Sequence, residues 1–305
     1  MRLFGGAHYD FLGTRRRSYM VSAVLVVIGL FSIFVHHGFV VGVDFTGGTL
    51  VQVKFAKPTS VAEIRDAIAA AGLTGAQIQN FESEDEYLIR VGLFQEEGGQ
   101  GVSAEVGAAL AAAYGADGYE VQRTAGVGPK VGSELRRMAT IAILMSFALT
   151  LVYLAFRFEW RFGVAAIIAT VHDIIITFGF ISLLNIEITL ATVAAILTII
   201  GYSLNDTIVV FDRIRENLKK RRKDPYTAIL NSSINETLPR TVLTSGTTLV
   251  ALLSLFVFGG GVIRPFALVL ILGIAIGTYS SIWVASPALQ EIENRSGGGE
   301  RGRSR

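Results

Sequence analysis

The stretch ITLATVAAILTIIGYSLNDTIVVF, residues 188–211, is apolar enough to cross a bilayer, yet Asp206 lies inside it. A second such stretch, TVLTSGTTLVALLSLFVFGGGVI at 241–263, directly follows Arg240. A charged side chain at the centre of a membrane helix costs roughly 2.5–3.5 kcal/mol, so such residues usually pair and serve ion, proton or substrate movement. The two opposite charges therefore favour a membrane protein whose function depends on the movement of ions, protons or a substrate.

The composition indicates an integral membrane protein. Hydrophobic residues make up 51% of the 305 residues, charged residues only 17%, and the apolar residues are gathered into long blocks. A membrane span needs about 20 of them. Six blocks meet this length: 18–36, 138–156, 162–184, 188–211, 240–260 and 264–289. The sequence predicts a mainly α-helical fold with six transmembrane helices, and only two of them carry an acidic residue, Asp173 and Asp206.

The basic residues predict the orientation of these spans. The first span follows Arg15, Arg16 and Arg17 and is too long for a signal-peptide core, so we expect an uncleaved anchor with a cytoplasmic N-terminus. The other basic clusters fall on the same side, although Arg136, Arg137 and Arg264 do not. The predicted organisation is a cytoplasmic segment at 1–17, the first transmembrane helix at 18–36, an extracytoplasmic domain at 37–137, the remaining helices at 138–289 with a cytoplasmic basic loop and interfacial helix at 212–239, and a disordered cytoplasmic tail at 290–305.

Composition also argues against several function classes. The net charge of +2 is explained by topology, so nucleic-acid binding is not expected. The chain has no cysteine, and its soluble part has no His and carboxylate set with metal-ligand spacing, so we expect neither a metal nor a cofactor. An intramembrane protease would need a GxGD motif or a His after His172, and the sequence has neither. We therefore expect no enzyme.

The long soluble stretch, residues 42–130, alternates β-like and helical runs. TLVQVKFA at 49–56 alternates with period two, and SVAEIRDAIAAAG at 60–72 has a capping box formed by Ser60 and Glu63. Further strands at 76–82, 86–92 and 119–128 and a helix at 103–115 complete the order βαββαβ. This order predicts a small ferredoxin-like α+β domain between the first two spans, which serves either to contact a substrate or partner or as a spacer.

Asp206 and Arg240 each share a helix face with other polar residues, since helix residues three, four, seven or eight apart lie on the same face. Asp206 and Arg240 lie at similar depth, so the carboxylate can take up and release a proton as the guanidinium approaches and withdraws. A static ion pair, or an Arg240 side chain that reaches the membrane surface, fits the same residues. The supporting polar residues are His172, Asp173, Tyr202, Ser203, Asn205, Thr244, Thr247 and Thr248.

Two other polar features remain open. His172 and Asp173 lie mid-way along the third span and either extend a proton path or are satisfied by neighbouring helices. Residues 224–239 place Tyr226 and Leu230 at helical spacing with later apolar residues, which predicts a short amphipathic helix on the cytoplasmic membrane surface or a plain connecting loop.

Four segments, in this order, resemble the SecF family of protein-export membrane proteins. They are GVDFTGGTL (42–50), VHDIIITFGF (171–180), GYSLNDTIVVFDRIREN (201–217) and NETLPRTVLTSGTTLVALLSLFVFGG (235–260). The resemblance covers essentially the whole chain. It implies an RND-type half-bundle of six helices whose other half is supplied by SecD.

The resemblance also implies a function. Such a complex assists the SecYEG translocon in the bacterial inner membrane and uses the proton motive force to promote translocation and release of unfolded preprotein, with YajC and YidC as further partners. In this family the Asp of the GYSxND motif and the Arg of the PRT motif are assigned to proton transport, and they correspond here to Asp206 and Arg240.

Alternatives remain beside this implied function. They are an RND-type half-transporter of small molecules or lipids, an assembly factor without proton transport, and sodium instead of protons as the coupling ion. A motif like Asp44, Gly47 and Gly48 recurs in the SecD family. It marks either a hinge or coupling turn, or a plain structural turn.

Overall fold

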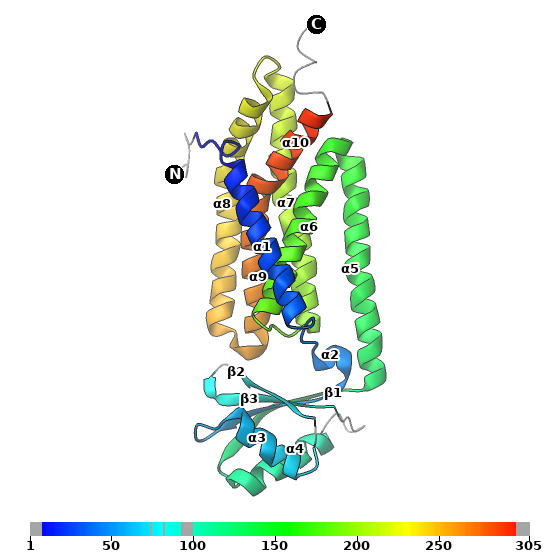
Figure 1. Cartoon of the computed structure of the whole chain (residues 1–305), viewed down its shortest axis with the longest axis vertical. Helices are drawn as coiled ribbons and strands as arrows, with labels where there is room; N and C mark the ends of the chain where they lie inside the picture. The colour runs from blue at the N-terminus through cyan, green and yellow to red at the C-terminus, as the bar shows by residue number, and fades with distance from the viewer. Residues whose placement is uncertain (1–7, 74, 82, 93–99, 297–305) are drawn as a thin grey trace. The chain divides into compact units, whose positions relative to one another are not determined.

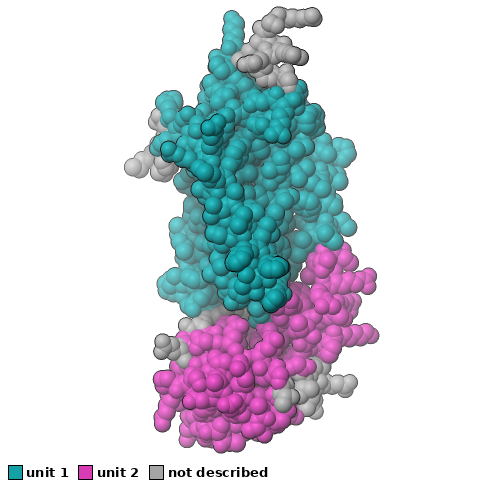
Figure 2. Space-filling view, viewed as in Figure 1, with its two compact units in different colours: residues 1–40, 143–187, 191–305 teal, residues 41–142, 188–190 magenta. Residues whose placement is uncertain are grey.

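The computed structural model describes residues 8–73, 75–81, 83–92 and 100–296. They form two compact units, which Figure 2 distinguishes by colour. The first unit is helical and comprises residues up to 40, 143–187 and 191 onward. The second comprises residues 41–142 and 188–190 and contains a four-stranded sheet.

The predicted spans are confirmed as helices. Apart from the short helices of the second unit, the helices are α1 (Arg15–Val35), α5 (Pro129–Arg157), α6 (Trp160–Leu183), α7 (Leu190–Lys220), α8 (Tyr226–Phe258), α9 (Gly260–Ser280) and α10 (Ser286–Arg295), with a π-helical turn, η1 (Ser281–Ala285), between the last two (Figure 1). Within the described residues, six helical segments are long and apolar enough to cross a membrane, the sixth being the run Ile263–Arg295. The chain is therefore a multi-pass membrane protein.

Helices α7 and α8 extend beyond their apolar segments, which corrects the predicted organisation of residues 212–239. The predicted interfacial helix is instead the first part of α8, which continues through Pro239. Its apolar stripe faces protein, because Leu230 and Ile234 are fully buried in the same core cluster as Phe211 of α7. An apolar stripe has the same sequence pattern whether lipid or protein covers it, so the pattern alone could not decide between the two.

Polar contacts hold the extended parts of α7 and α8 together. Glu236 of α8 accepts hydrogen bonds from Arg213 at 2.5 Å and from Arg221 at 3.0 Å. Asn217 is buried and donates to Ser233 at 2.9 Å and to Glu236 at 3.0 Å. These bonds join the end of α7 to α8. The predicted basic loop is helical as far as Lys220.

The C-terminal tail is more ordered than predicted. Disorder was expected for 290–305, and this is wrong for residues 290–295, because α10 continues to Arg295. Gln290 is buried, accepts a hydrogen bond from Arg15 at 3.1 Å and donates one to Thr227 at 2.8 Å. Residues 297–305 lie outside the described part of the chain.

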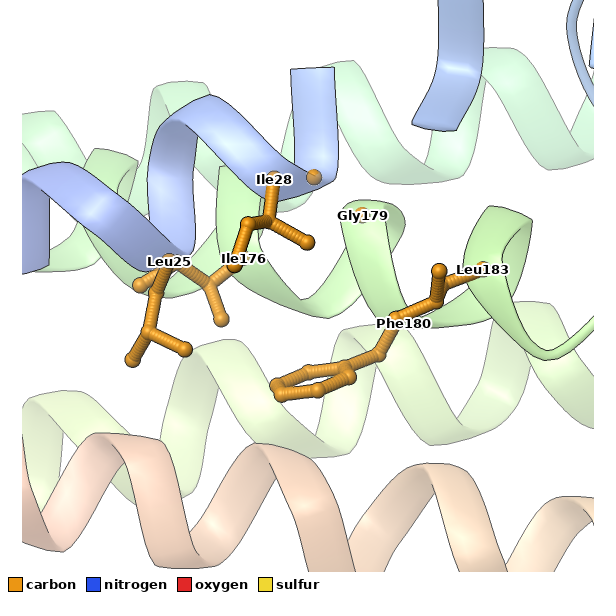
Figure 3. A pocket seen from close by; sticks show the side chains of 7 residues that line it. Leu25, Ile28, Ile176, Gly179, Phe180 and Leu183 are labelled. Carbon is orange, nitrogen blue, oxygen red and sulfur yellow. The ribbon is translucent and has the colours of Figure 1, made fainter. Parts of the chain in front are cut away.

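Helices α1 and α6 approach each other at a pair of glycines. A Cβ built on Gly179 would lie 2.4 Å from the Cα atom of Gly29, and one built on Gly29 would lie 2.9 Å from the Cα atom of Gly179. Figure 3 shows this crossing, where a small pocket is lined by Leu25, Ile28, Gly29, Ile176, Gly179, Phe180 and Leu183. Small residues at such positions let membrane helices approach closely.

We expect Gly179→Ala to destabilise the α1–α6 crossing by about 1–3 kcal/mol, because the added methyl group meets backbone that cannot rotate away. The measurement is the thermal midpoint of the purified protein in detergent. Gly163→Ala on the same helix is the control, since a Cβ there meets nothing within 4 Å. Equal midpoints for the two variants would contradict the close packing.

The second unit is an α+β domain. Its described elements are α2 (Val43–Thr46), β1 (Gly48–Phe55), α3 (Val61–Ala70), β2 (Gln77–Phe81), β3 (Ser83–Val91), α4 (Gln100–Tyr114) and β4 (Tyr119–Val127). The strands pair antiparallel in the order β2-β3-β1-β4. The predicted βαββαβ order and ferredoxin-like layout are confirmed.

Alternating residues of β1 build the core of this domain. Val51 and Val53 are fully buried with Ile89 of β3, and the fully buried Ile64 and Ile68 of α3 pack in the same cluster. Period-two burial in the strand and three-to-four spacing in the helix are the two patterns that the sequence contains. Helices α3 and α4 lie on the same face of the sheet (Figure 1).

The predicted capping box at the start of α3 is also present. The Ser60 backbone N–H donates to the Glu63 carboxylate at 2.9 Å, and the Ser60 hydroxyl accepts from the Glu63 N–H at 3.2 Å. The backbone hydrogen bond from Ser60 lowers the pKa of Glu63, with a smaller contribution from the Ser60 side chain. Two otherwise free N–H groups are satisfied in this way.

Candidate functional site

Asp206 lies on α7 and is only 3% exposed. Its Oδ2 atom accepts a hydrogen bond from the Ser245 hydroxyl of α8 at 3.1 Å. Ser245 in turn accepts a hydrogen bond from Thr278 of α9 at 2.8 Å. Hydroxyl groups of two neighbouring helices thus surround this carboxylate, which places a titratable group between three helices.

Arg240 is exposed on α8. Within the described residues it forms neither an ion pair nor a hydrogen bond with Asp206, although its charge acts on Asp206 through space. The α8 residue that reaches Asp206 is Ser245, which is five positions further and therefore about 140° around the helix. The two predicted partners lie close enough for electrostatic interaction, and this conformation does not pair them.

Of the polar residues predicted around Asp206 and Arg240, some join α7 to α8 and others are exposed, with no side-chain hydrogen bond to the neighbouring helix in the described part of the chain. Tyr202 of α7 donates to the carbonyl of Thr244 at 3.3 Å and hydrogen-bonds the Thr248 hydroxyl at 2.5 Å, so it joins α7 to α8. Thr247 is exposed, and among the residues that the structure describes it donates only to carbonyls of its own helix. Asn205 is exposed, and no hydrogen bond of its side chain occurs within the described residues.

A second buried carboxylate, Asp173 on α6, is 1% exposed and has more hydrogen bonds than Asp206. Its Oδ1 atom lies 2.8 Å from Nδ1 of His172. Its Oδ2 atom accepts hydrogen bonds from Ser203 of α7 at 2.5 Å and from Ser280 of α9 at 2.7 Å. Asp173 thereby joins three helices, and Ser203, predicted among the polar residues that support Asp206 and Arg240, bonds to Asp173.

Within the part of the chain that the structure describes, one ring nitrogen of His172 has no hydrogen-bond partner. The side chain is 9% exposed, and within the described residues its Nε2 atom makes no hydrogen bond. The ring lies 6.4 Å from the ring of Tyr279, whose hydroxyl donates to the Ser18 carbonyl of α1 at 2.9 Å. The Nε2 atom can take part in one further hydrogen bond.

Both carboxylates are linked to α7 and α9. Ser203 and Asp206 lie one turn apart on α7, and Thr278 and Ser280 lie two residues apart on α9. A shift of α7 against α9 would therefore change the hydrogen bonds of Asp173 directly, and it would act on Asp206 through Ser245 and Thr278. In the described residues no group of three or more His, Cys, Asp or Glu side chains is placed to hold a metal ion.

The third predicted feature lies in the α+β domain. The Asp44 Oδ2 atom accepts a hydrogen bond from the backbone N–H of Leu190 at 2.9 Å. Gly47 and Gly48 adopt φ angles of 73° and 112°, which side chains rarely tolerate. The three residues form one short turn together with α2.

Comparisons with known proteins decide the family. Residues 107–295 match the model described as "Protein export membrane protein SecD/SecF, C-terminal", and residues 32–59 match "SecD/SecF GG Motif". The chain belongs to the SecD/SecF family. Within it, the chain is similar to proteins named "Protein translocase subunit SecF": it is 46% identical to that of Gemmatimonas aurantiaca over 97% of this chain and 90% of the relative, and 48% identical to that of Desulfurispirillum indicum over 92% and 90%.

A solved structure of the SecD/SecF family supports the fold. The crystal structure of SecDF, a translocon-associated membrane protein from Thermus thermophilus, matches with a TM-score of 0.84 and 39% identity. The match covers 97% of this chain and 40% of the SecDF chain. A crystal structure of SecDF in a super-membrane-facing form matches with a TM-score of 0.69. This chain therefore corresponds to less than half of SecDF.

The two carboxylates of this SecF-type chain are recognisable in its sequence, but most of their hydrogen-bond partners are not. Ser245, Thr278 and Ser280 were not predicted, because single hydroxyl residues are common in apolar helices. A signal was available for Ser245, which is four positions after Thr241 on the buried face of α8. For Thr278 and Ser280 the only signal is a cluster of small polar residues at 278–281, directly before the π-helical turn.

Proposed function

We propose that this chain is the SecF-type half of an accessory complex of the Sec translocon and uses the proton motive force to promote preprotein translocation and release. The family supports a SecD-type partner, and the SecDF chain, of which this chain spans 40%, supports two joined halves. The observation that carries the proposal is Asp206, a buried carboxylate in an apolar helix with a hydroxyl neighbour, on which the charge of Arg240 acts although the two make no ion pair within the described residues.

The proposed mechanism uses a change in the surroundings of Asp206. The proton affinity of a carboxylate depends on whether a guanidinium or only neutral hydroxyls lie beside it. A conformational change that brings Arg240 to Asp206 and removes it again would therefore drive proton uptake from one side and release to the other. Each proton releases about 2.3 kcal/mol per 100 mV of membrane potential, enough to bias a protein between two states of similar energy.

Partners and location follow from the same proposal. The complex would lie in the bacterial cytoplasmic membrane with both termini of this chain in the cytoplasm. SecYEG would supply the translocation channel, and YajC and YidC are further expected partners. Asp173 would serve either as a second proton site or as a structural junction, and the stability and gradient-dependent release of Asp173→Ala separate the two roles.

The proposal is tested by preprotein release from sealed vesicles that contain this chain, its SecD-type partner and the translocon. We expect release to rise when a proton gradient is imposed and to return to the baseline when a protonophore is added. A response that survives the protonophore and is abolished by a sodium ionophore would contradict proton coupling. Release that depends on neither the proton gradient nor the sodium gradient would contradict the proposed function itself and favour an assembly factor.

In the same vesicles, Arg240→Met is expected to abolish the gradient-dependent part of release, because the methionine keeps much of the length of the side chain and removes its charge. Arg136→Met on α5 is the matched control, since Arg136 is an exposed arginine outside the apolar part of its helix. If both variants release preprotein as the wild type does, the Arg240 side chain takes no part in proton coupling and only extends to the membrane surface.

A further inference from the structure

In the second unit, the segment that enters the α+β domain pairs with the residues that begin α7. Val41 forms a parallel β-bridge with Ile188, and the Gly42 N–H donates to the Ile188 carbonyl at 2.9 Å. The Asp44 carboxylate then accepts the N–H of Leu190, the first residue of α7, at 2.9 Å. Residues 146 positions apart in the chain are thus joined at the start of a membrane helix.

The contact of Asp44 with Leu190 is a helix cap supplied from a distant segment. The first N–H groups of a helix have no partner within the helix. Aspartate is among the preferred residues for satisfying them, and its negative charge interacts favourably with the positive end of the helix dipole. Asp44 therefore favours one position of the α7 N-terminus relative to residues 41–44.

The glycines of the same turn fix it to the rest of the domain. A Cβ on Gly47 would lie 2.9 Å from the Cα atom of Pro129, the first residue of α5. A Cβ on Gly48 would lie 2.6 Å from the carbonyl oxygen of Val91, the last residue of β3. Both positions therefore lie so close to the backbone of β3 and of the start of α5 that a side chain would not fit. We expect the turn to move together with the sheet and with the start of α5.

We propose that residues 41–48, held against 188–190, form a clasp that couples the α+β domain to α7, with Asp44 as its positioning residue. The inference rests on the proposed function, because α7 is also the helix that carries Asp206. Asp206 follows Leu190 on one unbroken helix at a rise of about 1.5 Å per residue, a separation of roughly 24 Å. A displacement of α7 caused by proton transfer at Asp206 is thereby passed to the clasp and to the domain.

The first test compares Asp44→Ala with Asp66→Ala in the full complex. Asp66 is an exposed acid on α3 of the same domain and serves as the control. We expect Asp44→Ala to lower gradient-dependent release at least about fivefold, the lower end of typical coupling between sites, while proton flux through the complex stays at the wild-type level. Asp44→Asn keeps an acceptor oxygen and is expected to retain release. Wild-type release by Asp44→Ala would overturn the proposal.

A disulfide gives a sharper test, since the chain has no cysteine of its own. Val41→Cys and Ile188→Cys place a pair across the β-bridge, where neighbouring backbones lie within disulfide range. In the Asp44→Ala background, we expect oxidation of this pair to restore gradient-dependent release and reduction to remove it again. If release stays low in the oxidised protein, attachment of the clasp is not what Asp44 provides, and the proposal fails.

Hydrogen exchange measures the contact between Asp44 and Leu190 in the absence of a proton gradient. In the wild-type complex the amide of Leu190 is expected to exchange slowly, and Asp44→Ala is expected to accelerate it, whereas Asp66→Ala leaves it unchanged. Equal exchange in Asp44→Ala and wild type would overturn the clasp directly. Because this measurement does not depend on release, a failure of the proposed function and a failure of the clasp give different results.

Discussion

Asp206→Asn is expected to reduce gradient-dependent preprotein release to the level seen without a gradient. Asparagine has nearly the same shape, and its side-chain oxygen can still accept the hydrogen bond from Ser245. What it loses is the ability to bind and release a proton. Removal of a positioned proton-transfer group typically lowers the rate of the step that it serves by about 10²–10⁴-fold, so the expected loss is essentially complete.

The matched control for this variant is Asp212→Asn on the same helix. Asp212 lies partly exposed and forms an ion pair with Arg157 at 2.5 Å, outside the apolar segment. Exposed ion pairs contribute about 0–1 kcal/mol, so Asp212→Asn is expected to behave as the wild type. Both variants are compared at matched amounts of assembled complex. Equal release by the two would reduce Asp206 to a structural residue.

Asp173→Ala is expected to cause the largest loss of stability in the helical unit. The alanine leaves the hydroxyls of Ser203 and Ser280 and the Nδ1 atom of His172 without their shared acceptor. Interhelical hydrogen bonds in membranes average about 0.6 kcal/mol and reach about 1.7 kcal/mol each. With the cavity left by the carboxylate, which adds to this, we expect a clear fall in the thermal midpoint of the purified complex.

Thr177→Val is the matched control on the same helix. Thr177 is buried, and within the described residues its hydroxyl has no hydrogen-bond partner, so replacing the hydroxyl by a methyl group removes no bond. We expect its thermal midpoint to equal or exceed that of the wild type. Asp173→Asn, which keeps one acceptor oxygen, is expected to fall between the two. A stable Asp173→Ala variant that has lost gradient-dependent release would instead identify Asp173 as a second proton site.

The sequence predicted the elements well because their signals are local. Apolar runs of sufficient length identify membrane helices regardless of their neighbours. The alternation in 49–56 and the Ser60 and Glu63 capping box likewise need only a few adjacent residues. Asp206 and Asp173 were recognised as special for the same reason, since a carboxylate in an apolar helix is unusual wherever that helix packs.

The partners of these residues were not predictable, because they depend on how helices rotate against each other. Ser203 shares a helix face with Asp206, yet it points to Asp173 of α6. Arg240 was expected beside Asp206, but the rotation of α8 presents Ser245 there. A proline inside a sequence usually ends or kinks a helix, yet α8 continues through Pro239, with buried residues before and after it.

The other features that could not be predicted from the sequence are long-range contacts. The hydrogen bond from Leu190 to Asp44 crosses 146 positions, and no local pattern in either segment indicates the other. The sequence could mark Asp44, Gly47 and Gly48 only as a turn. In the structure both glycines lie against backbone atoms, and a coupling role for this turn is the proposal that the Asp44 variants test.

The most direct test of the account is proton flux through the purified complex in sealed vesicles, followed with a pH-sensitive dye inside the vesicles. We expect an imposed gradient to dissipate through the wild-type complex, Asp206→Asn to slow this flux to the rate of protein-free vesicles, and Asp212→Asn to leave it unchanged. Equal flux through wild type and Asp206→Asn would contradict the claim that Asp206 carries the coupling proton.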